Sequence, residues 1–154
     1  MLVYRIAKSE DWANDLSGFG AFRFGGRWNN PGMYLLYTNQ NSSLAYLENL
    51  VHFDEVNMPP RLFIVTIELN IKPSKLYEVP DEEYPDTWLQ LDNNANKATG
   101  DTWMQNKNYL AIKIRSAVNT AEYNYLLNPT FPGYHDLVTV KYIEPLHIDA
   151  RLAR

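Results

Sequence analysis

The residues best suited to chemistry lie in the run Phe24-Gly25-Gly26-Arg27-Trp28-Asn29, which breaks at Pro31-Gly32. Adjacent glycines allow backbone conformations that other residues avoid, and they let a ligand approach the main chain closely. The Arg27 guanidinium carries paired donors that match phosphate or carboxylate oxygens, and Trp28 adds a flat apolar surface beside it. Such a run is typical of an anion site next to a stacking surface, which a nucleotide ligand needs. The alternative is a glycine-rich turn with a solvated arginine, because short motifs of this kind often occur by chance.

The clearest helix of the sequence covers residues 42–53, and Asn41 or Ser42 can cap its start. Its apolar residues keep helical spacing, and the apolar face is marked by Leu44, Leu47 and Val51. Because a surface helix buries its apolar face, we expect the side chains on this face to point toward the core.

Glu48 is the anomaly of this helix. It falls at the remaining position of the i, i+3, i+4, i+7 pattern and projects between Leu44 and Ala45, toward the core side. A carboxylate is rarely buried without a partner. Glu48 therefore either pairs with an internal cation for structural reasons or lines a pocket. His52, one turn further on, can pair with it as a purely structural contact.

A strand expected at residues 110–118 places a hydroxyl group among apolar side chains. Ser116 points to the same face as Ile112, Ile114 and Val118, since alternate residues of a strand share a face. It is either a small hydroxyl that a neighbouring backbone group satisfies or a site residue. Tyr37, at the end of another expected strand, is the third candidate, and an ordinary core position is its alternative.

Several familiar chemistries have no support in the sequence. There is no phosphate-binding loop ending in Gly-Lys-Ser/Thr, and Gly18-x-Gly20 is not completed as a dinucleotide fingerprint. No serine lies in a Gly-x-Ser-x-Gly elbow. The three histidines, His52, His135 and His147, lack the spacing of metal ligands, so we expect no metal site.

Length and composition predict one domain over residues 1–154, a common size for a single folded unit. The chain has no cysteine, its first ten residues lack the apolar core of a signal peptide, and no apolar run approaches the ~20 residues of a membrane span. We therefore expect a cytoplasmic protein that does not bind membranes. The net charge of −4 argues against direct binding to nucleic acid.

The expected elements suggest an α+β fold, because strands outnumber helices without regular alternation. Residues 11–28 are expected to be irregular, residues 80–85 form an acidic connection, and residues 86–106 hold a helix interrupted near Thr99-Gly100. The expected strands cover residues 2–6, 33–38, 62–69, 75–79, 110–118 and 137–148.

Taken together, these motifs resemble the RES domain family. The similarity follows nearly the whole chain in order, and residues 80–97 are matched least. The matching motifs are Phe24-Gly25-Gly26-Arg27-Trp28-Asn29-x-x-Gly32, Tyr37-Thr38, Ser43-Leu44-Ala45-x-Leu47-Glu48-x-Leu50-Val51-His52, Gly100-Asp101-x-Trp103, Arg115-Ser116-Ala117-Val118 and Glu122-x-Asn124-Tyr125-x-Leu127-Asn128-Pro129.

The family takes its name from an Arg, a Glu and a Ser, which map to Arg27, Glu48 and Ser116. The resemblance implies that these three are catalytic. Glu48 would stabilise the positive charge that develops on a ribose when its bond to nicotinamide breaks, and Arg27 would hold a phosphate. Ser116 would hydrogen-bond nicotinamide or ribose rather than act as a nucleophile. The substrate-binding residues implied are these three together with Trp28, Tyr37, which would pack on the nicotinamide ring, and Asn128.

The resemblance also implies a role and partners. RES domains are toxins of bacterial type II toxin–antitoxin pairs encoded with an Xre-type antitoxin, within whose complex the toxin is expected to form a homodimer. Their fold resembles that of ADP-ribosyltransferases, a compact α+β core around a split, mixed or antiparallel sheet. The substrate is NAD⁺, cleaved by phosphorolysis or hydrolysis, with inorganic phosphate as the expected co-substrate and no cofactor or metal. A second anion site near the ribose would use Arg27 together with Arg5 or Arg23.

Three alternatives belong to other classes of function. The chain can be an ADP-ribosyltransferase that modifies a cellular protein, since the same bond of NAD⁺ is then broken. A non-enzymatic nucleotide-binding module explains the glycine–arginine run but leaves the inward Glu48 without a role. A ribonuclease toxin is disfavoured by the acidic charge and by the lack of a histidine pair.

Overall fold

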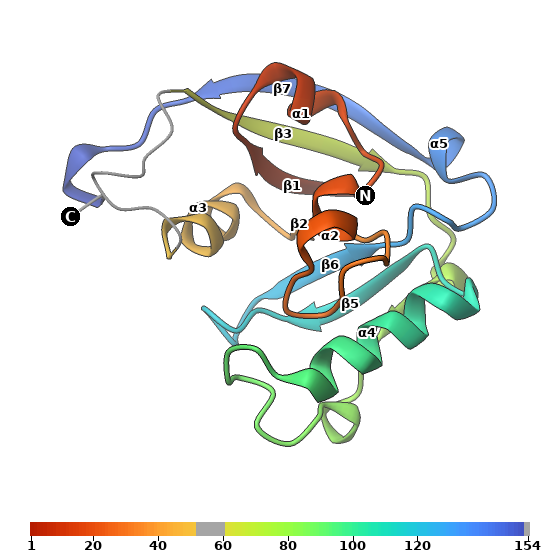
Figure 1. Cartoon of the computed structure of the whole chain (residues 1–154). Helices are drawn as coiled ribbons and strands as arrows, with labels where there is room; N and C mark the ends of the chain where they lie inside the picture. The colour runs from red at the N-terminus through yellow and green to blue at the C-terminus, as the bar shows by residue number, and fades with distance from the viewer. Residues whose placement is uncertain (52–60, 153–154) are drawn as a thin grey trace.

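The computed structural model describes residues 1–51 and 61–152 of the chain. In this part of the chain a seven-stranded mixed sheet has the order β4-β5-β6-β2-β1-β3-β7 (Figure 1). β4 and β5 are parallel, and the other neighbouring strands are antiparallel. The strands are β1 (Leu2–Ala7), β2 (Leu36–Asn39), β3 (Leu62–Leu69), β4 (Leu76–Glu78), β5 (Ala111–Arg115), β6 (Tyr123–Leu127) and β7 (Val138–Leu146).

The helices are short except for α4, and they do not alternate with the strands. Side chains cap the first turns of α3 and α4. Asn41 accepts from the Leu44 N–H at 2.8 Å, and Asn93 accepts from the Asn96 N–H at 3.1 Å. The expected α+β class is confirmed. The helices of the described residues are α1 (Glu10–Asn14), α2 (Phe19–Phe24), α3 (Ser42–Leu50), α4 (Asn94–Asn106) and α5 (Tyr134–Leu137), with 3₁₀ turns at Pro73–Lys75, Asp81–Glu83 and Ala150–Leu152.

The sheet is split between β1 and β2. In the described chain these two strands share one register pair, Tyr4 with Asn39, whereas β1 pairs with β3 along its whole length. The half made of β1, β3 and β7 therefore diverges from the half made of β2, β6, β5 and β4, and α3 lies at the open side (Figure 1). The split sheet expected from the resemblance is present.

Two hydrophobic cores hold the halves in place. The first joins both halves of the sheet, through residues such as Val65 and Ile67 of β3 and Leu127 of β6. The second lies between α4 and the strands β5 and β6, where Met104 meets Ile112 among its neighbours. The strand pattern of β3 follows expectation, because its buried residues alternate with more exposed ones over most of its length.

The structure corrects four expectations about the elements. Residues 11–28 are not wholly irregular, since α1 and α2 form within or across them, and the strand expected at 33–38 starts only at Leu36. β6 was not expected as a strand at all. These elements are short, so they carry too few residues for a clear period, and pairing with distant strands determines them.

The fourth correction concerns Gly100. It does not interrupt the helix, because α4 runs unbroken from Asn94 to Asn106. A Cβ atom at Gly100 would lie only 1.7 Å from the Trp28 carbonyl oxygen. The glycine therefore allows α4 to pack directly against the backbone of the glycine–arginine run, which is a tertiary requirement rather than a break in the helix.

Candidate active site

A pocket of about 620 Å³ opens where the sheet splits. Its wall is formed by β1, β2, α3, the glycine–arginine run and the segment before α4. Five charged residues lie on this wall: the acids Glu48 and Asp92 and the cations Arg5, Arg27 and Lys97. The pocket thus brings together the Arg27 and Glu48 that the sequence places 21 residues apart.

Glu48 is held at one end of the pocket by neutral donors. Its Oε1 accepts a hydrogen bond from the Ser116 hydroxyl at 2.6 Å and another from the Asn124 amide at 2.7 Å. Asn124 is oriented in turn by Asn39, whose amide donates to the Asn124 Oδ1 at 2.7 Å. Asn39 and Asn124 are directly paired in register between β2 and β6. The carboxylate is therefore fixed by two direct donors, one from β6 and one from the residue after β5, and the described contacts give it no cationic partner.

The hydrogen bonds of Ser116 decide its role. The Ser116 side chain is fully buried, and its oxygen accepts from the backbone N–H groups of Val118 and Asn119, both at 3.1 Å. A hydroxyl has one proton, and here that proton is donated to Glu48. Ser116 thus positions Glu48. The expected direct bond from Ser116 to nicotinamide or ribose stays a prediction.

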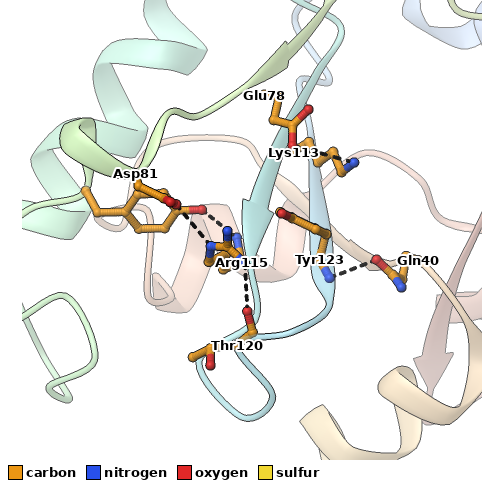
Figure 2. Close-up of polar contacts among 8 residues, drawn as sticks. Gln40, Glu78, Asp81, Lys113, Arg115, Thr120 and Tyr123 are labelled. Atoms are coloured by element: carbon orange, nitrogen blue, oxygen red, sulfur yellow. Dashed lines mark hydrogen bonds and ion pairs between the residues drawn. The ribbon is translucent and has the colours of Figure 1, made fainter.

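The turn that carries Ser116 is held in place by hydrogen bonds of the preceding residue, Arg115. The Arg115 guanidinium pairs with the Asp81 carboxylate at 3.1 Å and donates to the Thr120 carbonyl at 3.0 Å (Figure 2). The hydrogen bond that Arg115 donates to the Asp81 carboxylate raises the pKa of Arg115. On the neighbouring strand, the Tyr123 N–H donates to the Gln40 side chain at 2.9 Å (Figure 2). These contacts fix the ends of β5 and β6, next to Ser116 and Asn124.

The helix α3 faces the pocket differently from the expected pattern. Leu44 and Ala45 are fully buried, but Leu47 is 41% and Val51 is 61% exposed. The predicted apolar face was therefore wrong for its last two members. α3 packs on β1 and β2 through its start, and its later turn borders the pocket, where Glu48 and Val51 line the wall. The expected pairing of Glu48 with His52 lies outside the described residues.

The Arg27 end of the pocket is built on a tight turn. The Tyr37 hydroxyl accepts from the Trp28 N–H at 2.9 Å and donates to the Asn29 Oδ1 at 2.7 Å. A Cβ atom at Gly26 would lie 2.6 Å from that hydroxyl, so only glycine fits there. Burial raises the pKa of Tyr37, with the Trp28 N–H opposing the shift. Tyr37 lines the pocket and at the same time holds the backbone next to Arg27.

One nitrogen of the Arg27 guanidinium is bound by two backbone oxygens. This atom, Nη1, donates to the carbonyl of Trp88 at 3.1 Å and to that of Gln90 at 3.3 Å. Both acceptors belong to the connection that precedes α4. This connection lies within residues 80–97, which the family motifs match least. Arg27 therefore lines the pocket as expected, but it is not the solvated arginine of the alternative interpretation.

Trp28 and Asn128 are in the core rather than on the pocket wall. Trp28 is 3% exposed and packs against Tyr84, Trp88 and Trp103, with ring centroids 5.7–6.5 Å apart. The expected stacking surface for a ligand is thus buried. Asn128 is fully buried and its amide donates to the Met104 carbonyl at 3.0 Å. Both residues were reasonable candidates by type, but α4 covers them.

Arg5 and Arg23, which were expected to form a second anion site with Arg27, lie in different surroundings. Arg5 lines the pocket, yet its guanidinium donates to the carbonyls of Asp15 and Trp12 at 2.7 and 2.8 Å. Burial lowers the pKa of Arg5, and the Asp15 carboxylate opposes this shift. Arg23 is exposed, lies over the Phe24 ring and does not line the pocket.

The sequence analysis did not single out several polar residues that line the pocket, namely Asn39, Asn49, Asp92, Lys97 and Asn124. Asn124 lies inside one of the motifs quoted for the resemblance, so a signal for it was present. Asn39 follows Tyr37-Thr38 directly and had no motif of its own. Lys97 lies in the stretch that the motifs cover least, and no pattern in the sequence distinguishes it from a solvated lysine.

The fold and the site together define a class of protein. It is an α+β domain with a split sheet and with a pocket at the split that contains cations and carboxylates. The sequence pattern of the RES domain matches residues 2–149, and the chain belongs to the RES domain family. A similar protein, Toxin Res of Yersinia enterocolitica, is 29% identical over 147 residues, which are 95% of this chain and 94% of that protein. The Prs ADP-ribosylating toxin of Sphingobium sp. is 31% identical over 122 residues, 78% of this chain and 76% of that one.

The fold is shared with a solved structure, the crystal structure of the MbcT–MbcA toxin–antitoxin complex of M. tuberculosis. The match has a TM-score of 0.70 at 18% identity and covers 94% of this chain and 83% of that chain. Within residues 1–51 and 61–152, no helix combines the length and apolar character that crossing a membrane requires. The same residues contain no group of three His, Asp or Glu side chains arranged to hold a metal ion.

Proposed function

We propose that this chain is the toxin of a bacterial toxin–antitoxin pair and that it cleaves the nicotinamide–ribose bond of NAD⁺ in the cytoplasm. Membership of the RES family supports this role, as do two similar proteins, one named Toxin Res and one named for ADP-ribosylation. Transfer of ADP-ribose from NAD⁺ breaks the nicotinamide–ribose bond. The name of the ADP-ribosylating relative is therefore consistent with cleavage of this bond.

The position of Glu48 carries the proposal. Its Oε1 is bound by Ser116 and Asn124, and the residue lines a pocket that also contains Arg27. A carboxylate that is already oriented needs no reorganisation when positive charge develops next to it, and this is the main source of electrostatic catalysis. A binding module without chemistry would have no use for an acid held in this way.

The reaction proceeds by departure of nicotinamide. The bond between the ribose C1 and the nicotinamide nitrogen breaks, its electron pair stays on that nitrogen, and nicotinamide leaves as a neutral molecule. The ribose is left with the character of an oxocarbenium ion, which Glu48 stabilises through its negative charge. Arg27 binds a phosphate oxygen of the substrate, and the Tyr37 ring packs against nicotinamide.

Inorganic phosphate is the acceptor that we favour. Its oxygen attacks the ribose cation and forms ADP-ribose-1″-phosphate, whereas water would form ADP-ribose and release a proton. The three cations on the wall, Arg5, Arg27 and Lys97, make the pocket suited to anions. Mass spectrometry of the products with and without phosphate separates the two reactions. Plain ADP-ribose formed at an unchanged rate would identify a hydrolase.

Transfer of ADP-ribose to a cellular protein is the second candidate. The name of the Sphingobium protein favours it. The steps up to the ribose cation are the same, and a nucleophilic side chain of the target protein replaces phosphate. A mass increase on a cellular protein after expression of the chain would favour this reaction, and loss of NAD⁺ without such an increase would oppose it.

The antitoxin is the expected partner, and we propose an Xre-type protein that blocks the pocket. The structurally similar MbcT was solved in complex with its antitoxin. The chain should copurify with a small helical DNA-binding protein encoded beside it, and that protein should supply the DNA affinity because this chain has a net charge of −4. Tight DNA binding by the isolated chain at physiological salt would contradict this.

The test of the activity is release of nicotinamide from NAD⁺ by the purified chain. We expect release by the parent protein and release at least about 100-fold slower by the Glu48→Gln variant. Asn49→Ala is a matched control, because Asn49 lines the same pocket while its amide donates to the Ala45 carbonyl of its own helix. If the folded parent protein leaves NAD⁺ intact, the proposal is wrong.

A further inference from the structure

The segment Trp88–Asp92, called the strap below, supplies oxygen atoms to two cations of the pocket. The carbonyls of Trp88 and Gln90 accept from the Arg27 Nη1 at 3.1 and 3.3 Å. The Asp92 carboxylate lies 3.9 Å from the Lys97 Nζ. Arg27, Lys97 and Asp92 all line the pocket. One short segment thus places backbone or carboxylate oxygens next to both cations.

We propose that Arg27 and Lys97 form the binding site for the pyrophosphate of a dinucleotide, and that the strap occupies this site with substitute oxygens until the ligand displaces them. The identity of the ligand as a dinucleotide rests on the proposed function. The anion site itself rests on the geometry of these residues. It makes Lys97, rather than Arg5 or Arg23, the second cation for phosphate.

The bonds between the strap and the cations are weak enough to be exchanged. Both bonds of Arg27 are at the long end of the range for N–H···O hydrogen bonds, and both acceptors are neutral. The Asp92 side chain is 95% exposed, and an ion pair in such a position contributes little. Phosphate oxygens form charge-assisted bonds with guanidinium and ammonium groups, which are shorter and stronger than bonds to carbonyls.

The other cations of the region are less suited to this role. The Arg5 guanidinium is held by two carbonyl oxygens at 2.7 and 2.8 Å and is mostly buried, so a ligand would have to break shorter bonds there. Arg23 is outside the pocket wall. Among the cations that line the described pocket, Arg27 and Lys97 are therefore the two that a ligand can recruit at the lowest cost.

Displacement of the strap would leave little unsatisfied. The Trp88 carbonyl also accepts from the Asn96 amide at 2.7 Å, so it keeps a partner when Arg27 leaves. The Gln90 residue is exposed, and water can replace Arg27 at its carbonyl. Two non-glycine residues lie in the left-handed region at the ends of the strap: Thr87, just before it, at φ 58°, and Asp92, its last residue, at φ 54°. Such strain is tolerated at places where a segment changes conformation.

The test uses ADP-ribose, which contains the pyrophosphate but lacks nicotinamide, so that binding is measured without cleavage. Calorimetric titration in phosphate-free buffer should show about tenfold or greater loss of affinity in Lys97→Ala, the scale of one lost charge-assisted bond. Asp92→Asn should bind ADP-ribose more tightly than the parent, because the competing charge is gone. Lys113→Ala is the matched control, since Lys113 lies 3.8 Å from Glu78 in a similar ion pair outside the pocket (Figure 2).

The outcomes separate the site from the proposed reaction. Unchanged affinity in Lys97→Ala, or a loss as large in Lys113→Ala, would overturn the site, and weaker binding by Asp92→Asn would overturn the role of the strap. A parent protein that binds ADP-ribose through Lys97 but does not cleave NAD⁺ supports the site and contradicts the proposed activity. Binding of inorganic pyrophosphate without binding of ADP-ribose would retain an anion site and overturn its assignment to a dinucleotide.

Discussion

The two ends of the pocket are held by opposite means. At the Glu48 end, an acid is bound by short hydrogen bonds from Ser116 and Asn124, at 2.6 and 2.7 Å. At the Arg27 end, a cation makes longer bonds, at 3.1 and 3.3 Å, to carbonyls of the strap. The donors at the Glu48 end are Asn124 of β6 and Ser116, which directly follows β5, whereas the acceptors at the Arg27 end belong to a loop.

The difference fits the roles that the proposed function gives to the two ends. A group that stabilises a transient charge is most effective when it is already in place, and Glu48 meets this condition before any ligand arrives. A group that binds an anion from solution must exchange its existing partners for that anion. The comparison therefore predicts that changes at the Glu48 end affect the rate of the chemical step, while changes at the Arg27 end affect binding first.

Glu48→Gln should have the largest effect. The substitution keeps the volume and an oxygen that can accept from Ser116 and Asn124, but it removes the charge. We expect cleavage of NAD⁺ to fall by at least about 100-fold, the scale of losing one key electrostatic stabiliser, with the thermal unfolding midpoint nearly unchanged. A folded Glu48→Gln variant that cleaves NAD⁺ at the parent rate would show that the Glu48 end of the pocket does not govern the chemical step.

Changes at Arg27 should come next. Arg27→Ala should abolish growth arrest on expression, and Arg27→Lys should lose about tenfold in kcat/KM because lysine keeps the charge but not the paired donors. Steady-state kinetics should show most of the Arg27→Lys loss in KM. Cells that still stop growing with Arg27→Ala, at the parent's level of expression, would make the arginine structural.

The Asn39–Asn124 pair offers a sharper test of the Glu48 end. Asn124→Ala removes one donor to Glu48 and leaves the Asn39 amide without its acceptor. We expect kcat to fall by about tenfold, as for the loss of a hydrogen bond to a charged group, with little change in KM. Asn49→Ala should keep both constants near those of the parent. A loss confined to KM would contradict a role in positioning the carboxylate.

The smallest effect on the chemistry, but a clear one on stability, is expected from Gly100→Ala. Its new methyl group would collide with the Trp28 carbonyl, so α4 or the Arg27 turn must shift, and we expect about 1–3 kcal/mol of destabilisation. Denaturant unfolding measures it. Gly20→Ala is the control, because a Cβ atom there meets nothing within 4 Å. Equal stability of the two variants would show that α4 does not support the Arg27 end.

Local sequence was sufficient for the features that depend on near neighbours. The cap at Asn41, the helix that follows it and the alternation of β3 were all expected and are present, because hydrogen bonds and side-chain periods within a few residues determine them. The importance of Gly26 was also visible locally, although its reason, contact with the Tyr37 hydroxyl, was not. The family motifs identified Arg27, Glu48 and Ser116, which the fold brings to the pocket or into contact with it.

The tertiary structure alone decided which polar groups meet. Asn39 reaches Asn124, 85 residues away, because β2 and β6 pair in register, and no local pattern encodes that register. Trp28 is buried rather than available to a ligand because α4 packs on it through Gly100. The strap contacts Arg27, and Lys97 lines the same pocket, only when the chain folds back over the split sheet. Long-range pairing and burial depend on the sum of many distant contacts, so these residues could be placed only by the complete fold.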